Sequence, residues 1–356
     1  MVDLSEARGV RAEDAFDVEA VAAWLRRQCP ALTGVPAVRQ FVGGASNLTY
    51  ELVYPDTRLI LRRPPAGTRA KSAHDMGREF TVQSKLAAAY PYVPTMVARC
   101  EDEAVIGTDF YVMEWLDGLI LRKDPPADFD LDAAATRRLC LAVVDRLVQL
   151  HQVDVEAVGL QSLSRGEGYV ARQVGGWSDR FRKARTPNVA SFDATMTWLD
   201  EHRPADTARV LIHNDFRFDN LVLDRSDPGI VVGVLDWEMA TVGDPLLDVG
   251  AALAYWVQAD DDADMRRLRR QPTHLPGMLT RREVWEQYAD RTGADTDPAQ
   301  RRFYEVFGLF RLAVIAQQIY LRYHEGQTTN PAYRSFHGLV TYLDWRCSQV
   351  VAGKIA

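Results

Sequence analysis

The chain has few cysteines and no excess of positive charge, and both features narrow its possible functions. Among its 356 residues are 4 cysteines, all far apart, and none forms a CxxC pair or joins a cysteine–histidine cluster. This pattern disfavours a zinc site and a disulfide framework. With 42 basic and 49 acidic residues, the net charge of −7 disfavours a surface that coats nucleic acid. We therefore expect no nucleic-acid partner.

Long apolar runs are also missing. No stretch of about 18 consecutive apolar residues occurs, so we expect no membrane-spanning segment. The first residues, MVDLSEARGVRAEDAFD, are polar and acidic and lack the apolar centre of a signal peptide. These features predict a cytoplasmic protein with no membrane partner. The sequence has no repeat and no low-complexity segment, and nothing in it selects an oligomeric state, so a homo-oligomer stays open.

What is present is the composition of an ordinary globular protein. Apolar residues make up 47% of the chain and charged residues 26%. A chain of this length can hold two lobes, each with its own core. The first part of the chain changes between helical and strand-like patterning. We predict helices over 18–28 and 74–89 and hairpin strands over 38–42, 48–53, 59–61, 105–106 and 110–112.

The remainder of the chain is mainly of helical pattern, interrupted by three short apolar strands. We predict helices over 132–151 and 282–352, the latter broken near 327–331, and strands over 210–212, 221–223 and 231–235. The fold class that follows is α+β, with a sheet-rich lobe over 1–115 and a helical lobe over 116–356.

The strongest local signal is a polar segment between two apolar strands. The strand over 210–212 runs into His213-Asn214-Asp215, and Asn220 follows just before the next strand. Asp236 stands directly after the strand over 231–235. An Asp followed five residues later by Asn, and then by an Asp at a strand end, is the spacing of the kinase catalytic loop and its metal-binding aspartate.

These residue types are those needed to handle a nucleoside triphosphate. Amide and carboxylate oxygens suit Mg²⁺, which keeps waters and binds phosphate oxygens, so Asn220 and Asp236 are candidate metal ligands. A separate carboxylate, Asp215, can orient an attacking hydroxyl and accept its proton. His213 is expected to brace the loop that carries Asp215. The alternative is that Asp215 and Asn220 only form a turn, since both residue types favour turns.

On these residues the chain resembles the aminoglycoside phosphotransferase and choline kinase group, a branch of the protein-kinase-like fold. His213-Asn214-Asp215 with Asn220 is similar to that family's HGDxxxxN loop, and Asp236-Trp237-Glu238 is similar to its metal-binding acid strand. The segment GDPLLD that ends at Asp248 resembles the next family motif, whose final Asp would support the loop. The resemblance implies a bilobal fold and a small-molecule kinase that uses ATP and Mg²⁺ to phosphorylate a hydroxyl acceptor.

Further segments are similar to the kinase-like domains fused to some acyl-CoA dehydrogenases. This closer resemblance implies a hydroxylated acyl-CoA or a related hydroxy acid as the acceptor. Aminoglycosides, choline and other amino-alcohols stay open as alternatives. The segments that carry the resemblance are Gly43–Asn47, Leu61–Pro65, Arg78–Phe80, Val105–Glu114, Gly168–Val174 and Ile315–Tyr323.

The resemblance also implies the nucleotide contacts. The Gly-containing loop after residue 42 would close over the phosphates, because glycine permits close approach of the backbone. Arg62 stands where many relatives have the phosphate-binding Lys, and Glu79 on the following helix would pair with it. Backbone atoms at the lobe hinge would hold the adenine. The nucleotide-binding candidates are Gly43, Gly44, Ser46, Asn47, Arg62, Glu79, Glu114 and Trp115.

Two positions depart from the wider family. Arg62 replaces Lys, although Arg is usual in the acyl-CoA dehydrogenase-linked subgroup, and Asn214 replaces Gly. If residue 214 needs a positive φ, Asn is the next-best residue, so we expect altered loop detail and not lost function. The departures leave open a nucleotide-binding pseudokinase or regulatory module, and fold alone leaves open a scaffold without nucleotide. Locally, Gly43-Gly44 as a plain hairpin turn and Arg62–Glu79 as a structural ion pair are the alternatives.

Overall fold

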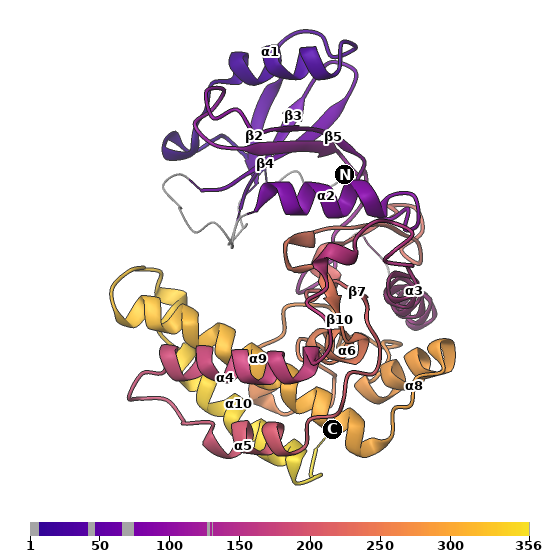
Figure 1. The fold of residues 1–356 in the computed structure, drawn as a ribbon, viewed down its shortest axis with the longest axis vertical. Coiled ribbons are helices and arrows are strands. Elements are labelled where there is room, and N and C mark those ends of the chain that lie inside the picture. Colours follow the sequence, from indigo (N-terminus) through magenta and orange to yellow (C-terminus); the bar gives the residue numbers. More distant parts are fainter. Residues whose placement is uncertain (1–6, 42–46, 66–74, 127–128, 130, 356) are drawn as a thin grey trace. The chain divides into compact units, whose positions relative to one another are not determined.

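The computed structural model describes residues 7–41, 47–65, 75–126, 129 and 131–355 (Figure 1). By compactness the chain divides into two units, the first Met1–Ile120 with Leu221–Glu238 and the second Leu121–Asn220 with Met239–Ala356. The first unit is sheet-rich and the second is helical, which confirms the predicted α+β class. The lobes 1–115 and 116–356, as functional units, stay a prediction.

Among the described residues, the first unit is built on a six-stranded sheet in the order β1-β2-β3-β4-β6-β5, with every neighbouring pair antiparallel. In the turn between β3 and β4, the N–H of Tyr54 donates to the carbonyl of Thr57 over 2.9 Å. Two of the three predicted hairpins, β2–β3 and β3–β4, are confirmed. The strands are β1 Ala7–Arg8, β2 Ala37–Phe41, β3 Leu48–Val53, β4 Arg58–Arg63, β5 Met96–Cys100 and β6 Phe110–Glu114.

The strand predicted over 105–106 is wrong. Val105 and Ile106 lie in a turn, in which the N–H of Val105 donates to the carbonyl of Asp102 over 3.2 Å, and β6 pairs with β5 instead. Both side chains are partly buried against the core cluster of the sheet. Two apolar residues can reach that core from a turn, so their apolar character alone does not distinguish a turn from a strand.

Two helices, α1 (Val18–Gln28) and α2 (Met76–Leu86), cover opposite faces of this sheet (Figure 1). Each begins after an aspartate whose side chain accepts a hydrogen bond from a backbone N–H of the first turn. Side chains of a strand alternate between the faces. On β4, Leu61 therefore packs in the cluster that contains α1, and Ile60 packs in the cluster that contains α2. Arg62 shares the face of Ile60 and is directed to α2.

A small hairpin from later in the sequence also belongs to the first unit. The strands predicted over 221–223 and 231–235 are present as β8 (Leu221–Leu223) and β9 (Val231–Val234), which pair antiparallel, and the N–H of Val234 donates to the carbonyl of Tyr92 over 2.6 Å. Gly118 allows the chain to approach the hairpin closely, because a Cβ there would lie 2.3 Å from Cγ1 of Val222. β9 ends at Val234, so Asp236 lies two residues beyond the hairpin.

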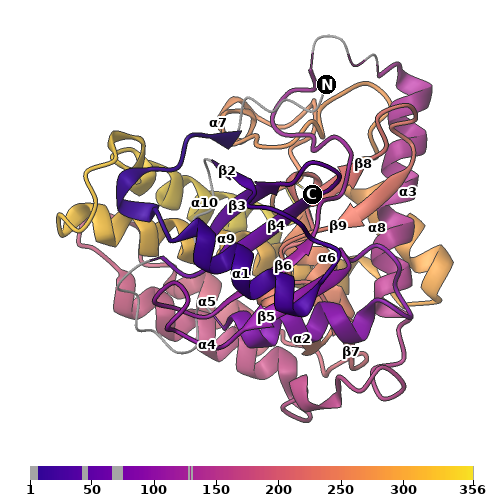
Figure 2. The same ribbon diagram turned by 90° about the horizontal axis from the view of Figure 1, so that it is seen from above.

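The second unit is organised around α9 (Pro298–His324), which packs on α4, α5, α6 and α10. The helices α9 and α10 lie side by side in both views (Figure 1, Figure 2). α6 and α9 approach closely, because a Cβ at Gly308 would lie 2.2 Å from the carbonyl oxygen of Gly250. The other helices are α3 Ala133–His151, α4 Tyr169–Ala184, α5 Asp193–Glu201, α6 Pro245–Leu253, α7 Ala263–Arg267, α8 Arg281–Thr292 and α10 Phe336–Val351.

The remaining elements are short strands and 3₁₀ turns. In the second unit, β7 (Val210–Ile212) and β10 (Thr241–Gly243) form an antiparallel pair, so the strand predicted over 210–212 is confirmed. Among the described residues, no helix combines the length and the apolar character that a bilayer crossing needs. The 3₁₀ turns are η2 Ala12–Asp14, η3 Gln161–Leu163, η4 Phe218–Asn220, η5 Trp237–Met239 and η6 Pro331–Tyr333.

The helix predicted over 282–352 is broken twice, once near 327–331 as expected and once between α8 and α9. Gly293, with a φ of +71°, ends α8 in the left-handed conformation that Gly adopts without strain. Asp297 accepts hydrogen bonds from the first N–H groups of α9, and Pro298 occupies the first helical position. These end signals outweigh the continuous apolar pattern.

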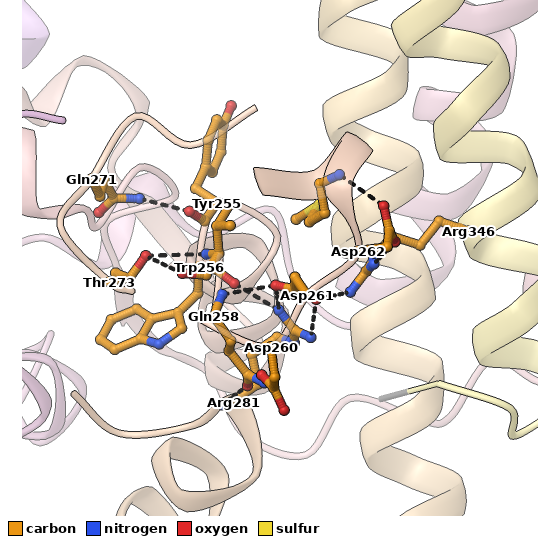
Figure 3. A network of polar contacts seen from close by, with 12 residues as sticks. Tyr255, Trp256, Gln258, Asp260, Asp261, Asp262, Gln271, Thr273, Arg281 and Arg346 are labelled. Atoms are coloured by element: carbon orange, nitrogen blue, oxygen red, sulfur yellow. Dashed lines mark hydrogen bonds and ion pairs between the residues drawn. The ribbon is translucent and has the colours of Figure 1, made fainter. Parts of the chain in front are cut away.

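A buried ion network joins three parts of the second unit (Figure 3). Asp261 accepts hydrogen bonds from Arg281 at 2.7 and 2.9 Å and from Arg346 at 2.6 Å. Arg281 begins α8 and Arg346 lies in α10. Burial alone would raise the pKa of Asp261, but the hydrogen bonds and charges of Arg281 and Arg346 hold it below its ordinary value. The network thus fixes the loop before α7 against two helices.

Candidate functional site

The segment after β7 is clamped by a buried carboxylate. Asp248, on α6, accepts hydrogen bonds from the backbone N–H groups of His213 at 2.8 Å and Asn214 at 2.7 Å. His213 is fully buried, and its Nδ1 accepts the N–H of Asp215 over 3.2 Å. These contacts are the geometry that the predicted supporting role of Asp248 and bracing role of His213 require.

His151 contacts Asp248, and Tyr288 contacts His151; the sequence singled out neither residue. Nε2 of His151, at the end of α3, lies 3.1 Å from Oδ2 of Asp248, and its Nδ1 lies 2.7 Å from the hydroxyl of Tyr288 on α8. Burial alone would raise the pKa of Asp248, but the hydrogen bond from His151 and the backbone hydrogen bond from His213 hold it below its ordinary value. Asp248 is therefore an anion, which strengthens its hydrogen bonds to the loop.

Asn214 adopts the left-handed backbone conformation, with a φ of +64°. The structure therefore confirms that this position needs a positive φ, which Asn tolerates better than most residues other than Gly. The side-chain Nδ2 of Asn214 donates to the carbonyl of Met239 over 3.0 Å. Arg311, on α9, donates from Nη2 to the carbonyl of Asn214 over 2.7 Å. The loop is thus held from both sides.

Asp215 is oriented by side chains of its own loop. Nδ2 of Asn220 donates to the carbonyl oxygen of Asp215 at 2.8 Å and to its Oδ2 at 3.0 Å. Arg217 donates from Nη2 to Oδ2 of Asp215 over 3.1 Å, and its Nε lies 3.1 Å from Oδ1. The guanidinium of Arg217 also lies over the ring of Tyr255, 4.6 Å from the centroid. The structure brings the predicted pair together and adds Arg217, which sequence reasoning missed.

The first unit supplies a second cluster of charged side chains. Arg62 of β4 donates from Nη1 to Oε1 of Glu79 on α2 over 2.5 Å, so the predicted pair is confirmed. The side chain of Glu79 is 1% exposed and that of Arg62 is 11% exposed. Burial raises the pKa of Glu79, and the charge of Arg62 opposes that rise only in part.

Arg62 also reaches the predicted metal ligand. Its Nη2 donates to Oδ1 of Asp236 over 3.2 Å. Asp236 has a φ of +68°, which is uncommon for a residue other than Gly and costs conformational energy. Trp237 is fully buried and donates from Nε1 to the carbonyl of Val234 over 2.8 Å.

Glu238 makes two further contacts within the first unit. Asn47, which is buried, donates from Nδ2 to Oε2 of Glu238 over 3.1 Å, and Arg78 donates from Nη1 to the carbonyl of Glu238 over 2.7 Å. Asn47 is therefore placed beside the segment that carries Asp236. Three other members of the predicted phosphate loop, Gly43, Gly44 and Ser46, lie outside the described residues.

The predicted adenine-binding residues stand at the end of β6. The backbone N–H of Glu114 donates to the carbonyl of Thr95 over 2.9 Å. The guanidinium of Arg58 lies over the ring of Trp115, 4.1 Å from the centroid. Both residues belong to the same unit as the ion pairs of Arg62, and their contact with a nucleotide stays a prediction.

The second unit contains a hollow of about 510 Å³. Asn214 of the clamped loop lies in its wall, and so does Trp177 of α4. The guanidinium groups of Arg180 and Arg311 lie 4.5 and 5.3 Å from the centroid of the Trp177 ring. Among the described residues that line the hollow, none is acidic. Its charged lining residues are Arg165, Arg172, Arg180 and Arg311.

A model of a known protein family matches most of the chain. The model of the phosphotransferase enzyme family matches residues 37–289. Among curated relatives, acyl-CoA dehydrogenase family member 10 of Mus musculus is 36% identical over 300 residues, which are 84% of this chain and 28% of that protein. Family member 11 of Homo sapiens is 31% identical over 337 residues, or 92% of this chain and 42% of that protein. The chain thus spans less than half the length of these relatives.

Solved structures share the fold. A structure from Ralstonia eutropha that is assigned to the aminoglycoside phosphotransferases superposes with a TM-score of 0.78 at 29% identity, and covers 94% of this chain and 99% of that one. Choline kinase from Cryptosporidium parvum superposes with a TM-score of 0.63 at 11% identity, and covers 95% and 98%. These likenesses confirm the predicted protein-kinase-like fold, and the second shows the fold alone.

Proposed function

Because the chain belongs to the phosphotransferase enzyme family, we propose that it transfers the γ-phosphoryl group of ATP to a hydroxyl of a small molecule. The observation that carries this proposal is the setting of Asp215. Asn220 and Arg217 hold its carboxylate, and Asp248 clamps the backbone just before it. A carboxylate fixed in this way is pre-oriented to act as a general base.

In the proposed reaction Asp215 orients the acceptor hydroxyl and takes its proton. The hydroxyl oxygen forms a bond to the γ-phosphorus while the bond to the β,γ-bridging oxygen breaks, and ADP leaves with that oxygen. Phosphoryl transfer depends on positioning and charge stabilisation more than on covalent chemistry. Arg217 contributes by keeping the carboxylate of Asp215 in one orientation.

We propose Mg²⁺ as the metal, with Asn220 and Asp236 as its protein ligands. Bound Mg²⁺ would neutralise charge on the phosphates of ATP. The donor set fits this ion, because proteins commonly hold Mg²⁺ by one or two oxygen side chains while phosphates and waters complete its shell. Nδ2 of Asn220 is engaged by Asp215, which leaves the amide oxygen as the atom that a cation could use. Leu221 pairs with Val234 in the β8–β9 hairpin. Asn220 is the residue before Leu221, and Asp236 follows Val234 by two residues.

The nucleotide contacts form the second part of the proposal. Glu79 holds the guanidinium of Arg62, whose planar donors can bind a phosphate through two N–H groups. The remaining assignments rest on the family resemblance. These are the phosphate loop of Gly43, Gly44, Ser46 and Asn47 and the backbone of Glu114 and Trp115 at the adenine.

The proposed acceptor is an anionic hydroxy compound, either a hydroxyacyl-CoA or a free hydroxy acid. Its support is the basic hollow, which would attract phosphate or carboxylate groups and repel cationic aminoglycosides and choline. Trp177 in the same wall adds an apolar surface for an acyl chain. The names of the relatives, which are acyl-CoA dehydrogenase family members, agree with an acyl-CoA. Structures of the same fold hold kanamycin with GDP, or hygromycin B with AMP-PNP, at 15% identity, so they bear on the fold and not on this acceptor.

A nucleotide-binding pseudokinase or regulatory module is the second candidate. The observation in its favour is the ion pair between Arg62 and Asp236, because it engages the carboxylate that a metal ion would use. A protein of this kind would bind Mg–ATP without transferring its phosphoryl group.

The test is a turnover assay with four acceptors: 3-hydroxybutanoyl-CoA, free 3-hydroxybutanoate, kanamycin and choline. ADP release reports turnover, and the thermal shift with Mg–ATP reports nucleotide binding. We expect turnover of the CoA ester and a loss of about 10²–10⁴-fold in Asp215→Ala, with nucleotide binding retained. The matched control is Asp200→Ala, which removes an exposed carboxylate of α5 that pairs with Arg203.

Each other outcome points elsewhere. Equal turnover by Asp215→Ala and wild type contradicts the assigned base. Binding of Mg–ATP without turnover of any acceptor favours the pseudokinase. Turnover of kanamycin or choline, but not of the CoA ester, replaces the anionic acceptor class with a cationic one.

A further inference from the structure

Asn214 combines two features that the catalytic assignments leave unused. It stands where the resembling family has Gly, directly before the proposed base Asp215, and its residue lies in the wall of the basic hollow. A Gly at this position would present no side chain to the hollow. This chain therefore has an amide group next to its base that the family motif lacks.

The amide of Asn214 is held at a defined place. Its Nδ2 donates to the carbonyl of Met239 over 3.0 Å, and Tyr169 lines the same hollow as Asn214. Tyr169 is buried, and burial raises its pKa to about 12, so its hydroxyl stays protonated at neutral pH. Because the Met239 carbonyl holds the amide in place, the amide is part of the shape of the hollow.

The backbone of Asn214 is held independently of its side chain. Its N–H donates to Oδ1 of Asp248 over 2.7 Å, and its carbonyl accepts from Nη2 of Arg311 over 2.7 Å. Its φ of +64° is a conformation that Gly adopts freely. Replacement of Asn214 by Gly should therefore remove the amide and leave the path of the loop unchanged.

We propose that Asn214 is a specificity-determining residue, whose amide limits the bulk that an acceptor can carry beside the carbon that bears its hydroxyl. The inference rests on the proposed function. A hydroxyl that gives its proton to Asp215 must come within hydrogen-bond distance of that carboxylate, so the neighbouring atoms of the acceptor meet the next side chain of the loop. The Asn214 amide leaves room for linear acceptors. It clashes with acceptors that carry a branch next to the hydroxyl-bearing carbon.

The test compares 3-hydroxybutanoyl-CoA with its 2-methyl-branched analogue, 3-hydroxy-2-methylbutanoyl-CoA. The readout is the ratio of kcat/KM for the branched and the linear acceptor, so a general loss of activity cancels. One methyl group in a fitted pocket changes kcat/KM by about 10–200-fold. We expect Asn214→Gly to raise the ratio by at least about 10-fold, in that range.

Asn214→Asp is the matched control, because it keeps the size and shape of the side chain and changes its chemistry. If bulk decides, this variant keeps the wild-type ratio even where its rate falls. A ratio that is unchanged in Asn214→Gly, or that rises equally in Asn214→Asp, overturns the inference while the proposed function stands. Thermal unfolding checks that both variants are folded before their ratios are compared.

Failure of the proposed function has a different signature. Wild-type protein that turns over neither acyl-CoA nor free 3-hydroxybutanoate contradicts the proposed acceptor class, and this inference falls with it. Wild-type activity on the linear ester, together with a flat ratio across the variants, contradicts the role of Asn214 alone.

Discussion

Two buried carboxylates, one in each unit, hold functional segments in opposite ways. Asp248 accepts two backbone N–H groups and a contact from His151, and its pKa is lowered. Glu79 holds one side chain, that of Arg62, and its pKa is raised because burial outweighs the nearby cation, with the charge of Asp236 adding to the rise. The clamp of the loop that carries Asp215 therefore relies on an acid that is ionised at neutral pH, whereas the Arg62 pair contains an acid that takes up a proton more readily.

Asp248→Ala removes the carboxylate that holds the loop in the second unit. Of the changes predicted here, it should have the largest effect. A hydrogen bond to a charged group is worth about 1.5–3 kcal/mol, so loss of the two backbone bonds should lower the free energy of unfolding by about 3–6 kcal/mol. Turnover should be lost as well, since the loop that carries Asp215 loses its clamp. Urea unfolding followed by circular dichroism, together with the turnover assay, measures both effects.

The control for that variant is Asp200→Ala, an exposed carboxylate on α5, which should change the free energy of unfolding by no more than about 0.5 kcal/mol. Wild-type stability and turnover in Asp248→Ala would show that other contacts hold the loop and that Asp248 does not clamp it.

Removal of the two partners of the Arg62–Glu79 pair should have unequal effects, somewhat smaller than that of Asp248→Ala. Breaking a buried pair costs about 3–5 kcal/mol when the remaining charge is uncompensated. Arg62 cannot lose its proton, whereas Glu79 can gain one. Glu79→Leu should therefore lower the free energy of unfolding by up to this amount, because Asp236 still pairs with Arg62, and Arg62→Met should lower it less.

The double variant, Glu79→Leu with Arg62→Met, sharpens this prediction. It leaves neither charge behind, so its loss of stability should be smaller than the sum of the two single losses. Equal single losses that add in the double variant would mean that the pair has no interaction in the folded protein, and that Glu79 is not the protonatable partner described above.

The same comparison shows what the sequence could predict. The Arg62–Glu79 pair was predictable, because strand alternation and the family spacing place both residues on one side of the sheet. Asp248 was predictable from its motif. His151 was not, because it is 97 residues from Asp248, and a single histidine on a helix has no local pattern that names its partner.

Arg217 and Arg311 were missed for a related reason. An arginine beside aromatic residues in a sequence is indistinguishable from an exposed one until packing shows that it bonds Asp215 or the carbonyl of Asn214. Val105 and Ile106 show the opposite error. Their apolar character predicted a strand, but they lie in a turn and pack against the core from there. Local pattern predicts elements and motif residues, and long-range contacts decide which charges complete the site.

The smallest predicted effect is a difference in slope with pH. The pKa of Asp248 is lowered in the folded protein, so its contribution to stability is complete above the ordinary Asp pKa of about 3.9 and is lost as the pH falls through the folded value. The pKa of Glu79 is raised, so its contribution is complete below the ordinary Glu pKa of about 4.3 and is lost as the pH rises through the folded value.

Urea unfolding of wild type, Asp248→Asn and Glu79→Gln between about pH 3 and pH 7 measures these slopes. The advantage of wild type over Asp248→Asn should shrink as the pH falls below about 4, and its stability relative to Glu79→Gln should decline as the pH rises above about 4. Slopes of the same sign would show that both acids are held in the same way, because only opposite shifts between folded and unfolded chains give opposite slopes.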